Sequence, residues 1–353
     1  MNIGIPKERR PSEFRVGLTP AGVELLTREG HGCYIERGAG VGAGFQDDSY
    51  RAAGGRIVYS GEEVYGRADL VLKVARPTDE ELDWLVPMQT LMAYLYLPSA
   101  RPEKLQALLD KSITAIAYEA IRLPDGSLPA LRPLSQIGGR MAAQIAATLS
   151  QNGHGGRGVL LGGVAGVPPA EAVILGAGVV GENAARAFLG MGAQVTLLDR
   201  DLDRLQQLED ALPGRIVTLV SHPFNLERVC RYADVLVGAV HQPGGRAPVL
   251  ITRTMIASMR PGAVFIDLSI DEGGCAETSR PTTHASPVYV EEGVLHCCIP
   301  NLPGVVARTA THAFLNAAWP YIQQVAALGP DAAIAADPVL RTGVAAHRGT
   351  VLS

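Results

Sequence analysis

The stretch AVILGAGVVGENAARAFLGMGAQVTLLDR, residues 172–200, restricts the fold more than any other part of the chain. A continuous apolar run leads directly into a G-x-G-x-x-G turn, Gly176 to Gly181, after which a helical pattern and a second apolar run end at Asp199. The order strand, glycine turn, helix, strand is that of a βαβ unit, whose two strands are parallel. We therefore expect a parallel sheet covered by helices in this part of the chain.

Each glycine of this turn has its own geometric task in a site that binds a dinucleotide. Gly176 permits the tight turn, Gly178 lets the backbone approach a pyrophosphate, and Gly181 lets the helix pack closely on the sheet. The helix N-terminus then presents N–H groups and a positive dipole end to the phosphates. Asp199 can accept hydrogen bonds from both ribose hydroxyls, which favours NAD over NADP, although Arg200 beside it could hold a 2′-phosphate. The alternative is a glycine-rich turn in an α/β core without any ligand.

Length and composition indicate two domains of the α/β class. A chain of 353 residues exceeds one core of ordinary size, and 40 glycines against 6 phenylalanines fit many tight strand–helix turns. Short apolar runs alternate with helical patterns through the first third of the chain. One helix is expected from the N-cap Thr19 to Gly30, and another begins after the N-cap Ser60.

A segment dense in proline, glycine and serine, residues 123–139, predicts a crossover between the two domains. A long helix is expected after it, from about Arg140 to Ser150, and the helical pattern after Asn301 is of the kind that packs against a sheet. The two series of strands and helices predict two domains with parallel sheets, and the last helices are expected to return and cover the first domain.

The net charge and the cysteines indicate which kind of partner the chain binds and in which compartment it functions. A net charge of −4 without a lysine- or arginine-rich run argues against nucleic acid and leaves a small molecule or a second copy of the chain. The five cysteines form no C-x-x-C pair and no metal-ligand spacing, and Cys297 and Cys298 are expected in a core strand. An odd number of cysteines without a secretory signal predicts reduced thiols in the cytoplasm. No uncharged apolar run reaches the ~18 residues of a membrane span.

Two aspartates interrupt the apolar stretch FIDLSIDEGGC, residues 265–275. We expect a strand AVFIDLSID that is closed by Asp271, which then lies at the carboxyl end, where parallel sheets bind ligands. Gly273 and Gly274 behind it would allow close backbone approach. Asp267 is expected to be a structural carboxylate bonded to backbone N–H groups or to a helix start, because an unpaired buried carboxylate costs several kcal/mol.

Two cationic residues of the first domain are candidates for a substrate site. Lys73 stands in the strand pattern DLVLKVA among apolar neighbours. It is either a lysine at a strand end that extends to water, or a desolvated ammonium that polarises a carbonyl and donates a proton. Arg15, just before a helix, is suited to bind a carboxylate through two parallel N–H bonds, although an ordinary surface arginine fits the same pattern.

A set of six stretches, in order over nearly the whole chain, reads IGIPKERRPSEFRVGLTP, DLVLKVARP, ITAIAYEAI, GGRGVLLGGVAGVPPAEAVILGAGVVGENAAR, VFIDLSIDEGGCAETSRPTTH and IPNLPGVVARTAT. It resembles the alanine dehydrogenase family, which is related to the NAD(H)-binding alpha subunit of the proton-pumping nicotinamide nucleotide transhydrogenases. The resemblance implies NAD-dependent oxidative deamination of a small L-amino acid to a 2-oxo acid and ammonia, with reductive amination as the reverse. It also implies a homohexamer and two Rossmann-like domains with parallel sheets, of which the substrate domain is discontinuous. The expected ranges are 1–128 with 308–353 for the substrate domain and 129–307 for the NAD-binding domain.

The resemblance further implies roles for residues at matching motif positions. Arg15 and Lys73 would hold the substrate carboxylate and carbonyl. Asp271 would be the acid near the nicotinamide, and Asn301 would line the same cleft. The cofactor contacts expected in this way are Ser135, Gly176, Gly178, Val179, Val180, Gly181, Asp199, Val240 and Asp271.

Two positions, Tyr96 and Gln136, depart from the family pattern. In the stretch LMAYLYLPS, Tyr96 aligns with a histidine that the family uses as a substrate contact and proton donor. A phenol can donate a hydrogen bond, but with an unperturbed pKa of about 10 it is a poor proton shuttle at neutral pH. Tyrosine is also bulkier, and the family's usual glutamate after the crossover serine is Gln136 here. The candidate catalytic residues are thus Lys73, Tyr96 and Asp271, and the substrate could differ from alanine.

Three functions are compatible with these residues. The first is an NAD-dependent amino-acid dehydrogenase. The second is an imine or ketimine reductase using NAD(P)H, which acts on a preformed C=N bond and needs fewer proton transfers. The third is a non-catalytic NAD(H)-binding protein, such as a nucleotide sensor or a transhydrogenase-like subunit. The joint presence of Arg15, Lys73 and Asp271 favours an enzyme.

Overall fold

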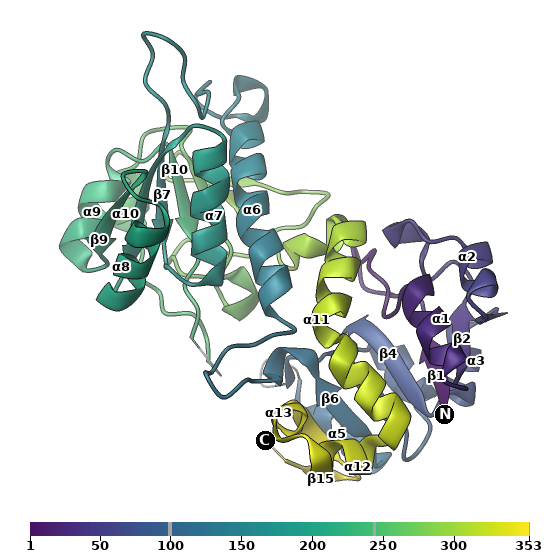
Figure 1. Cartoon of the computed structure of the whole chain (residues 1–353). Coiled ribbons are helices and arrows are strands. Elements are labelled where there is room, and N and C mark those ends of the chain that lie inside the picture. The colour runs from purple at the N-terminus through teal and green to yellow at the C-terminus, as the bar shows by residue number, and fades with distance from the viewer. Residues whose placement is uncertain (98–100, 243–244, 353) are drawn as a thin grey trace. The chain divides into compact units, whose positions relative to one another are not determined.

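The structure, a computed structural model, describes residues 1–97, 101–242 and 245–352. The chain divides into two compact units, which we call unit 1 (Met1–Leu134 with Pro303–Ser353) and unit 2 (Ser135–Leu302). In Figure 1 the purple N-terminal elements and the yellow C-terminal helices accordingly belong to one unit. The expected α/β class with a discontinuous unit is confirmed. The divisions fall at 134/135 and 302/303, whereas the boundaries expected from the sequence are 128/129 and 307/308.

Unit 1 is built on a sheet that contains, over the described residues, eight strands in the order β15-β14-β6-β5-β4-β1-β2-β3. The strands from β1 to β6 pair in parallel, but β14 is antiparallel to β6 and β15 is antiparallel to β14, so the expected all-parallel sheet needs correction at this edge. β4 and β5 are almost entirely buried, as parallel strands covered on both faces are. The strands are β1 (Asn2–Ile5), β2 (Gly32–Glu36), β3 (Arg56–Val58), β4 (Leu70–Ala75), β5 (Thr90–Tyr94), β6 (Thr114–Ala117), β14 (Val344–His347) and β15 (Thr350–Val351).

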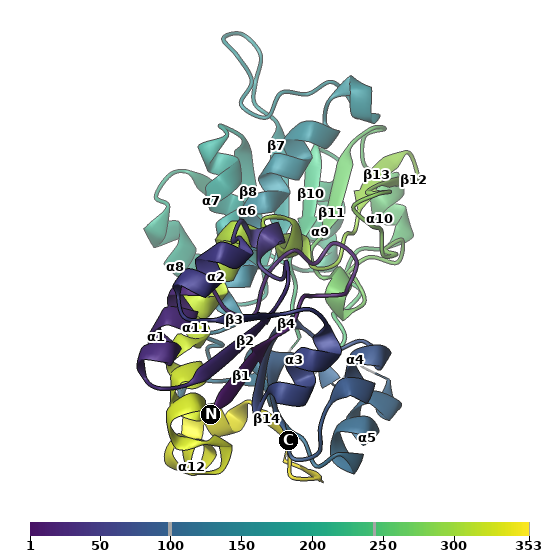
Figure 2. The same ribbon diagram turned by 90° about the vertical axis from the view of Figure 1, so that its right-hand side faces the viewer.

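Helices cover both faces of this sheet (Figure 2). Apolar residues of α3, α4 and α5 form one buried cluster with β4, β5 and β6, while α1 and α11 lie on the other face. The expected N-caps are confirmed, because Thr19 accepts from the N–H of Gly22. Ser60 accepts in the same way from the N–H of Glu63. The helices are α1 (Pro20–Arg28), α2 (Asp47–Ala52), α3 (Gly61–Arg67), α4 (Asp79–Trp84), α5 (Pro102–Asp110), α11 (Ala307–Leu328), α12 (Pro330–Ala336) and α13 (Pro338–Thr342).

Unit 2 is built on a sheet with seven strands among its described residues, in the order β12-β13-β11-β10-β7-β8-β9. All pair in parallel except β12, which is antiparallel to β13. The chain order reverses beside β7, and ligands of such sheets bind at the carboxyl strand ends next to this reversal. The strands are β7 (Glu171–Leu175), β8 (Gln194–Asp199), β9 (Ile216–Val220), β10 (Val235–Gly238), β11 (Val264–Asp267), β12 (Tyr289–Glu291) and β13 (Val294–Cys297). The helices are α6 (Arg132–Leu149), which begins in unit 1, α7 (Val179–Gly190), α8 (Leu202–Ala211), α9 (Pro223–Cys230) and α10 (Arg253–Ala257).

Helix α6 begins at Arg132, well before the expected start near Arg140. Pro133 fits in its first turn, because a first-turn N–H has no partner within the helix. One of the glycines that suggested a loop, Gly139, serves helix packing instead. A Cβ at Gly139 would lie 2.2 Å from the carbonyl oxygen of Val180, so α6 approaches the start of α7 more closely than a side chain would allow.

Two further segments differ from the sequence-based expectations. β11 ends at Asp267, and the chain then turns instead of continuing as a strand to Asp271. Near the C-terminus, β14 and β15 form a hairpin that the sequence reading missed. Its turn residues Arg348 and Gly349 both have positive φ, at 48° and 81°, which suits the tight turn of a hairpin.

The cysteines are core residues, as expected for Cys297 and Cys298. All five are buried and none forms a disulfide. Burial raises the pKa of Cys297 to about 11 and that of Cys298 to about 12, so both thiols are poor nucleophiles at neutral pH.

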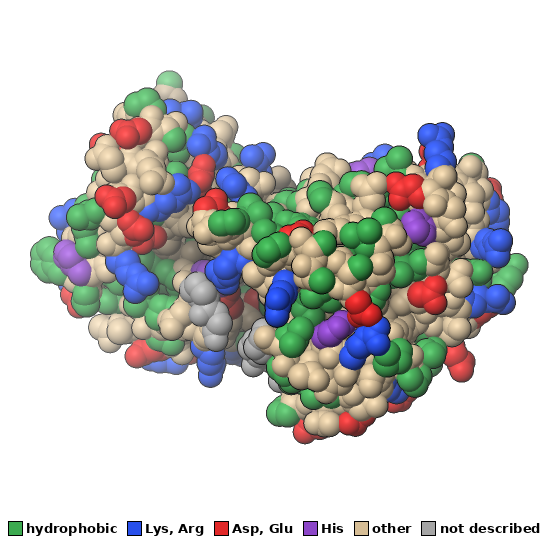
Figure 3. Space-filling model, turned by 60° about the horizontal axis from the view of Figure 1, so that its bottom comes forward, with side chains coloured by type: hydrophobic (Ala, Val, Ile, Leu, Met, Phe, Trp, Pro, Cys, Tyr) green, Lys and Arg blue, Asp and Glu red, His purple; other side chains and the backbone are tan. Residues whose placement is uncertain are grey.

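The surface carries charges of both signs. On the face in Figure 3, the described Lys and Arg side chains are interspersed with Asp and Glu rather than gathered into one basic field. None of the helices in the described part of the chain is long and apolar enough to cross a membrane.

Candidate functional site

The glycine turn after β7 has the geometry that the sequence predicts. Gly176 has a φ of 108°, and a Cβ there would lie 2.3 Å from the carbonyl oxygen of Ala239. A Cβ at Gly181 would lie 1.8 Å from the carbonyl oxygen of Gly176. Neither position can hold a side chain without displacing backbone, so the tight turn and the close helix contact both require glycine.

Gly178 differs from the other two glycines because no described atom lies within 4 Å of the place where its Cβ would be. It is the N-cap of α7, and among the described residues no side chain caps this helix. The first-turn N–H groups of a helix need an outside acceptor, and an uncapped N-terminus attracts an anion. The open backbone at Gly178 and the uncapped α7 therefore fit the diphosphate of a dinucleotide. Val179 and Val180 form the first turn of α7.

Asp199 ends β8 and holds the glycine turn from one side. Its Oδ2 accepts from the N–H of Ala177 at 2.6 Å, and its Oδ1 accepts from the N–H of Asp201 at 3.0 Å. Arg204 of α8 holds the same turn from the other side, donating from Nε to the carbonyl oxygen of Ala177 at 2.9 Å. Sequence reasoning missed Arg204, although its place in the helix after Asp199 was a usable signal.

Arg204 also donates to Glu182 in the first turn of α7, with a 2.5 Å separation. Burial would raise the pKa of Glu182, but Arg204 and Arg186 outweigh it and lower that pKa. The glutamate charge near the helix N-terminus is thus neutralised by two arginines, which leaves the local field favourable to an anion.

Asp267 has the structural role that the sequence predicts. The side chain is 1 % exposed and accepts from the N–H of Ser269 and of Cys275, both at 2.9 Å. The Oγ of Ser279 donates to it as well, at 2.5 Å. Burial raises the pKa of Asp267, although these hydrogen bonds favour the carboxylate and oppose that shift. The carboxylate therefore binds the loop that follows β11 to the end of the strand.

This loop carries Asp271 and brings it to Asn301. Asp271 lies in a short 3-10 helix, η5 (Ile270–Glu272), and is exposed there. Its Oδ2 accepts from the backbone N–H of Asn301 at 3.2 Å, and Asn301 has a φ of 53°, which asparagine tolerates better than most residues. Two predicted site residues from separate loops are thus neighbours. Asp271 is not the last residue of the strand, because the chain turns at Asp267.

His241, which sequence reasoning missed, contacts Glu272, the residue that follows Asp271. Nδ1 of His241 is 2.5 Å from Oε1 of Glu272, and the backbone N–H of Gln242 donates to Oε2 of Glu272 at 3.3 Å. His241 follows Val240, whose carbonyl oxygen accepts from the Oγ of Ser269 at 2.8 Å. The position of a histidine just after a strand of the parallel sheet was the signal that could have found it.

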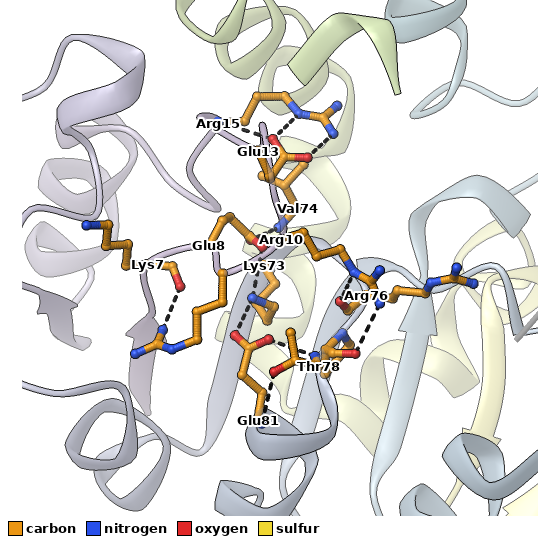
Figure 4. A network of polar contacts seen from close by, with 12 residues as sticks. Lys7, Glu8, Arg10, Glu13, Arg15, Lys73, Val74, Arg76, Thr78 and Glu81 are labelled. Carbon is orange, nitrogen blue, oxygen red and sulfur yellow. Dashed lines mark hydrogen bonds and ion pairs between the residues drawn. The ribbon is translucent and has the colours of Figure 1, made fainter. Parts of the chain in front are cut away.

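Unit 1 contains a buried ionic network that joins β4 to two other elements (Figure 4). Nζ of Lys73 lies 2.9 Å from Oε2 of Glu8 and 2.6 Å from Oε1 of Glu81. Glu8 also accepts from the N–H of Val74 at 2.6 Å, and Glu81 completes the capping box of α4 with Thr78. The network therefore connects the loop after β1, the strand β4 and the start of α4.

Lys73 has no exposed surface, and both of its carboxylate partners are buried with it. Burial by itself would lower the pKa of Lys73, but Glu8 and Glu81 outweigh it and raise that pKa. The pKa of Glu8 is also raised, chiefly by burial and further by the carboxylates of Glu13 and Glu81, while Lys73 opposes the shift. Lys73 is thus a charged member of an internal network with Glu8 and Glu81.

Arg15 lies above this network and is almost entirely buried (Figure 4). Its Nε and Nη2 donate to the two carboxylate oxygens of Glu13, at 2.7 and 2.5 Å. Burial would lower the pKa of Arg15, but the Glu13 carboxylate outweighs it and raises that pKa. Arg15 thus makes the two parallel N–H bonds to a carboxylate that the sequence predicts. The carboxylate on its Nε–Nη2 edge is that of Glu13, a residue of the same chain.

Tyr96 lies just after β5 in a strained backbone conformation. Its φ is 45°, its ring stacks on Tyr94 with centroids 6.4 Å apart, and 41 % of the residue is exposed. The backbone N–H groups of Leu95 and Tyr96 both donate to the buried carboxylate of Glu119, the latter at 2.5 Å. Burial raises the pKa of Glu119, while these N–H groups and Arg76 oppose the shift. Glu119, which sequence reasoning missed, thus holds the turn that presents Tyr96.

The remaining predicted positions are less informative. Ser135 lies in the first turn of α6, not in a loop, and is half-buried there. Gln136 follows it on the same helix, and nothing in the structure explains its replacement of glutamate.

Both parts of the chain match a known family. Residues 4–138 match the N-terminal domain, and residues 142–353 the C-terminal domain, of the alanine dehydrogenase/PNT family. The chain belongs to the alanine dehydrogenase family. The alanine dehydrogenase of Halomonas elongata is 46% identical over 349 residues, which cover 99% of this chain and 94% of the relative. The family resemblance expected from the sequence is confirmed.

Solved structures agree with this membership of the alanine dehydrogenase family. An L-alanine dehydrogenase matches with a TM-score of 0.96 and 43% identity, covering 100% of this chain and 97% of that one. A transhydrogenase from Sinorhizobium meliloti matches with a TM-score of 0.84 at 24% identity, covering 100% of this chain and 99% of that one, which shows a shared fold. The fold of the two units is therefore that of the family throughout.

Proposed function

We propose that the chain is an NAD-dependent amino-acid dehydrogenase of the alanine dehydrogenase type, which converts a small L-amino acid reversibly to a 2-oxo acid and ammonia. The observation that carries this proposal is the cradle at Gly178, where open backbone and the uncapped N-terminus of α7 meet, in a chain of this family. An imine or ketimine reductase and a non-catalytic NAD(H)-binding protein are the alternatives that the experiment below separates.

The cofactor in this proposal is NAD. The first-turn N–H groups of α7, from Val179 to Gly181, would bind the diphosphate. Asp199 would exchange its hydrogen bond with Ala177 for the ribose hydroxyls, and Val240 and Ser135 would be further contacts. Bound in this way, the nicotinamide supplies the acceptor for the substrate hydride. No metal is part of the proposal.

The substrate contacts in this proposal are the residues at the family's motif positions. Arg15 would bind the substrate carboxylate through the Nη1–Nη2 edge of its guanidinium, since Glu13 binds the Nε–Nη2 edge. Tyr96, Asp271 and Asn301 would be further substrate contacts, as the family resemblance implies. We assign Lys73 to the internal network with Glu8 and Glu81 instead of to the substrate.

The partner in this proposal is a small amino acid or 2-oxo acid. The assembly is a homo-oligomer, a hexamer as the family resemblance implies, and the compartment is the cytoplasm, as the cysteine pattern predicts.

The experiment that tests the proposal follows NADH oxidation by absorbance, with pyruvate and a panel of larger 2-oxo acids, each with and without ammonium. Ammonium-dependent turnover of any acid supports the dehydrogenase, and the acid that reacts fastest identifies the substrate. Turnover of cyclic imines without ammonium would establish the reductase instead. NADH binding by fluorescence without turnover of either class would leave a binding protein.

A further inference from the structure

His241 and Glu272 form an acid–base pair at the carboxyl edge of the unit 2 sheet. Nδ1 of His241 lies 2.5 Å from Oε1 of Glu272, and the side chains are 49% and 31% exposed. Glu272 belongs to η5 and directly follows Asp271, the predicted acid near the nicotinamide. The pair therefore lies next to the place where the proposed reaction occurs.

The sheet fixes this position through the backbone. β10 and β11 are parallel neighbours in which Gly238 pairs with Asp267, so the loops that follow them start side by side. The Oγ of Ser269 then donates to the carbonyl oxygen of Val240, and the backbone N–H of Gln242 donates to Glu272. Two further hydrogen bonds therefore join the loop that carries His241 to the loop that carries Glu272.

The hydrogen bond also decides which nitrogen can act. When Nδ1–H donates to the Glu272 carboxylate, the lone pair lies on Nε2, which then accepts a proton. A carboxylate that orients an imidazole in this manner stabilises the cation that forms. Among the described residues, charged groups near the pair include Asp271 on η5 and Arg246, whose Nε would lie 2.8 Å from a Cβ at Gly273.

We propose that His241 is a catalytic residue that transfers protons in the dehydrogenase reaction, with Glu272 as its positioning residue. This inference rests on the proposed function. After hydride leaves Cα, the substrate is an iminium, and water adds to its carbon. Nε2 of His241 takes a proton from that water as the C–O bond forms. It then gives the proton to the nitrogen of the carbinolamine, the C–N bond breaks, the hydroxyl proton leaves to solvent, and a 2-oxo acid and ammonia result.

The pair accounts for the departure at Tyr96. An imidazole exchanges protons near neutral pH, whereas a phenol with a pKa of about 10 does not. Lys73, the other predicted proton donor of unit 1, is buried between Glu8 and Glu81. His241, paired with Glu272, offers an imidazole for this chemistry.

The experiment compares wild-type protein with His241→Asn, Glu272→Gln and the control His154→Asn. Asparagine keeps an N–H near the place of Nδ1 and removes the titrating ring, and His154 is an exposed histidine of unit 2 in a separate 3-10 helix, η4 (Asn152–His154). We expect His241→Asn to lower kcat/KM by about 100-fold or more and to remove the limb of the pH profile that an imidazole produces. Glu272→Gln should lower it less, and His154→Asn should not change it.

A second readout uses the protein without cofactor or substrate. In proton NMR of the full chain, which has eight histidines, the resonance lost in His241→Asn identifies the His241 ring. We expect the titration midpoint of this resonance to move to lower pH in Glu272→Gln, because a carboxylate favours the protonated ring. A midpoint that Glu272→Gln does not move would overturn the pairing. NADH affinity by fluorescence should stay within about threefold in His241→Asn, so that the loss is chemical.

The outcomes separate this inference from the proposed function. A wild-type protein that turns over no amino acid or 2-oxo acid overturns the proposed function, and the role of His241 with it. An active wild type with a His241→Asn variant that keeps its kcat/KM at every pH overturns the role of His241 alone. Loss of NADH binding in His241→Asn would show a structural role and would equally overturn it.

Discussion

The ammonium of Lys73 lies 2.6 Å from the carboxylate of Glu81, and the lysine has no exposed surface. Glu8 is the second partner, at 2.9 Å, so one cation is enclosed by two carboxylates. The stability of unit 1 should therefore depend on all three charged side chains. If one of them is removed, a remaining partner is left as an uncompensated buried charge.

Lys73→Met should destabilise the protein by about 3–5 kcal/mol, because it leaves Glu8 and Glu81 buried without their cation. Urea unfolding measures this loss. The matched control Lys7→Met, at an exposed lysine, should change the free energy of unfolding by less than about 0.5 kcal/mol. Adding Glu8→Gln to Lys73→Met should recover part of the loss. A Lys73→Met protein of normal stability with a raised KM would instead establish the substrate contact first predicted.

His296 should make the stability of unit 2 depend on pH. It is fully buried, stacks on Tyr289 with centroids 4.9 Å apart, and burial lowers its pKa. A histidine whose pKa is lower in the folded state binds fewer protons there than in the unfolded state. Its contribution is therefore fully present above the unfolded pKa of about 6.5 and is lost as the pH falls toward the lowered folded value.

The measurement for His296 is the urea midpoint of wild type and His296→Gln between pH 7.5 and 5. The wild-type midpoint should fall more steeply with decreasing pH than that of the variant, which lacks the buried imidazole. Parallel curves for the two proteins would contradict the prediction.

Gly178 and Gly181 should respond differently to alanine. Gly181→Ala places a Cβ 1.8 Å from a backbone oxygen and should lower the free energy of unfolding by several kcal/mol, since backbone has to move. Gly178→Ala meets no described atom within 4 Å and should fold normally. Its Cβ should nevertheless weaken NADH binding by about tenfold, about 1.4 kcal/mol, because it lies where the diphosphate approaches. Unfolding curves and NADH fluorescence separate the two effects, and unchanged NADH affinity in a folded Gly178→Ala would place the diphosphate elsewhere.

Asp199→Ser should change the preference between cofactors. The carboxylate is suited to two ribose hydroxyls and repels a 2′-phosphate, so its loss should weaken NADH binding by about tenfold and improve the relative affinity for NADPH. Fluorescence titration with both dinucleotides measures the ratio. Arg200→Ala serves as the matched control, since it should lower only the residual NADPH affinity. If Asp199→Ser leaves the ratio unchanged, the assignment of NAD to this carboxylate is wrong.

The features that sequence reasoning predicted correctly depend on a few neighbouring residues. The strand, glycine turn and helix from Ala172 onward, the N-caps Thr19 and Ser60, and the structural role of Asp267 all belong to this kind. Their causes are local, because a turn needs a positive φ, a helix end needs an acceptor, and a buried carboxylate needs nearby N–H groups.

The features that sequence reasoning missed depend on which helices, strands and loops lie side by side in the folded chain. Glu8 reaches Lys73 across 65 positions of sequence, and His241 reaches Glu272 across 31. The early start of α6 follows from a glycine that packs on α7. In the same way, the C-terminal strands exist because β6 offers them an edge.

By itself, the sequence of this protein determined the α/β class, the dinucleotide fingerprint and the family. Tertiary structure alone decided that Lys73 is internal and that His241 has a carboxylate partner. The physical reason is that turns, caps and periodicity act between residues close in the chain, whereas the charge, solvation and proton affinity of a side chain depend on the atoms around it. Those atoms come from strands and loops that only the assembled sheet brings together.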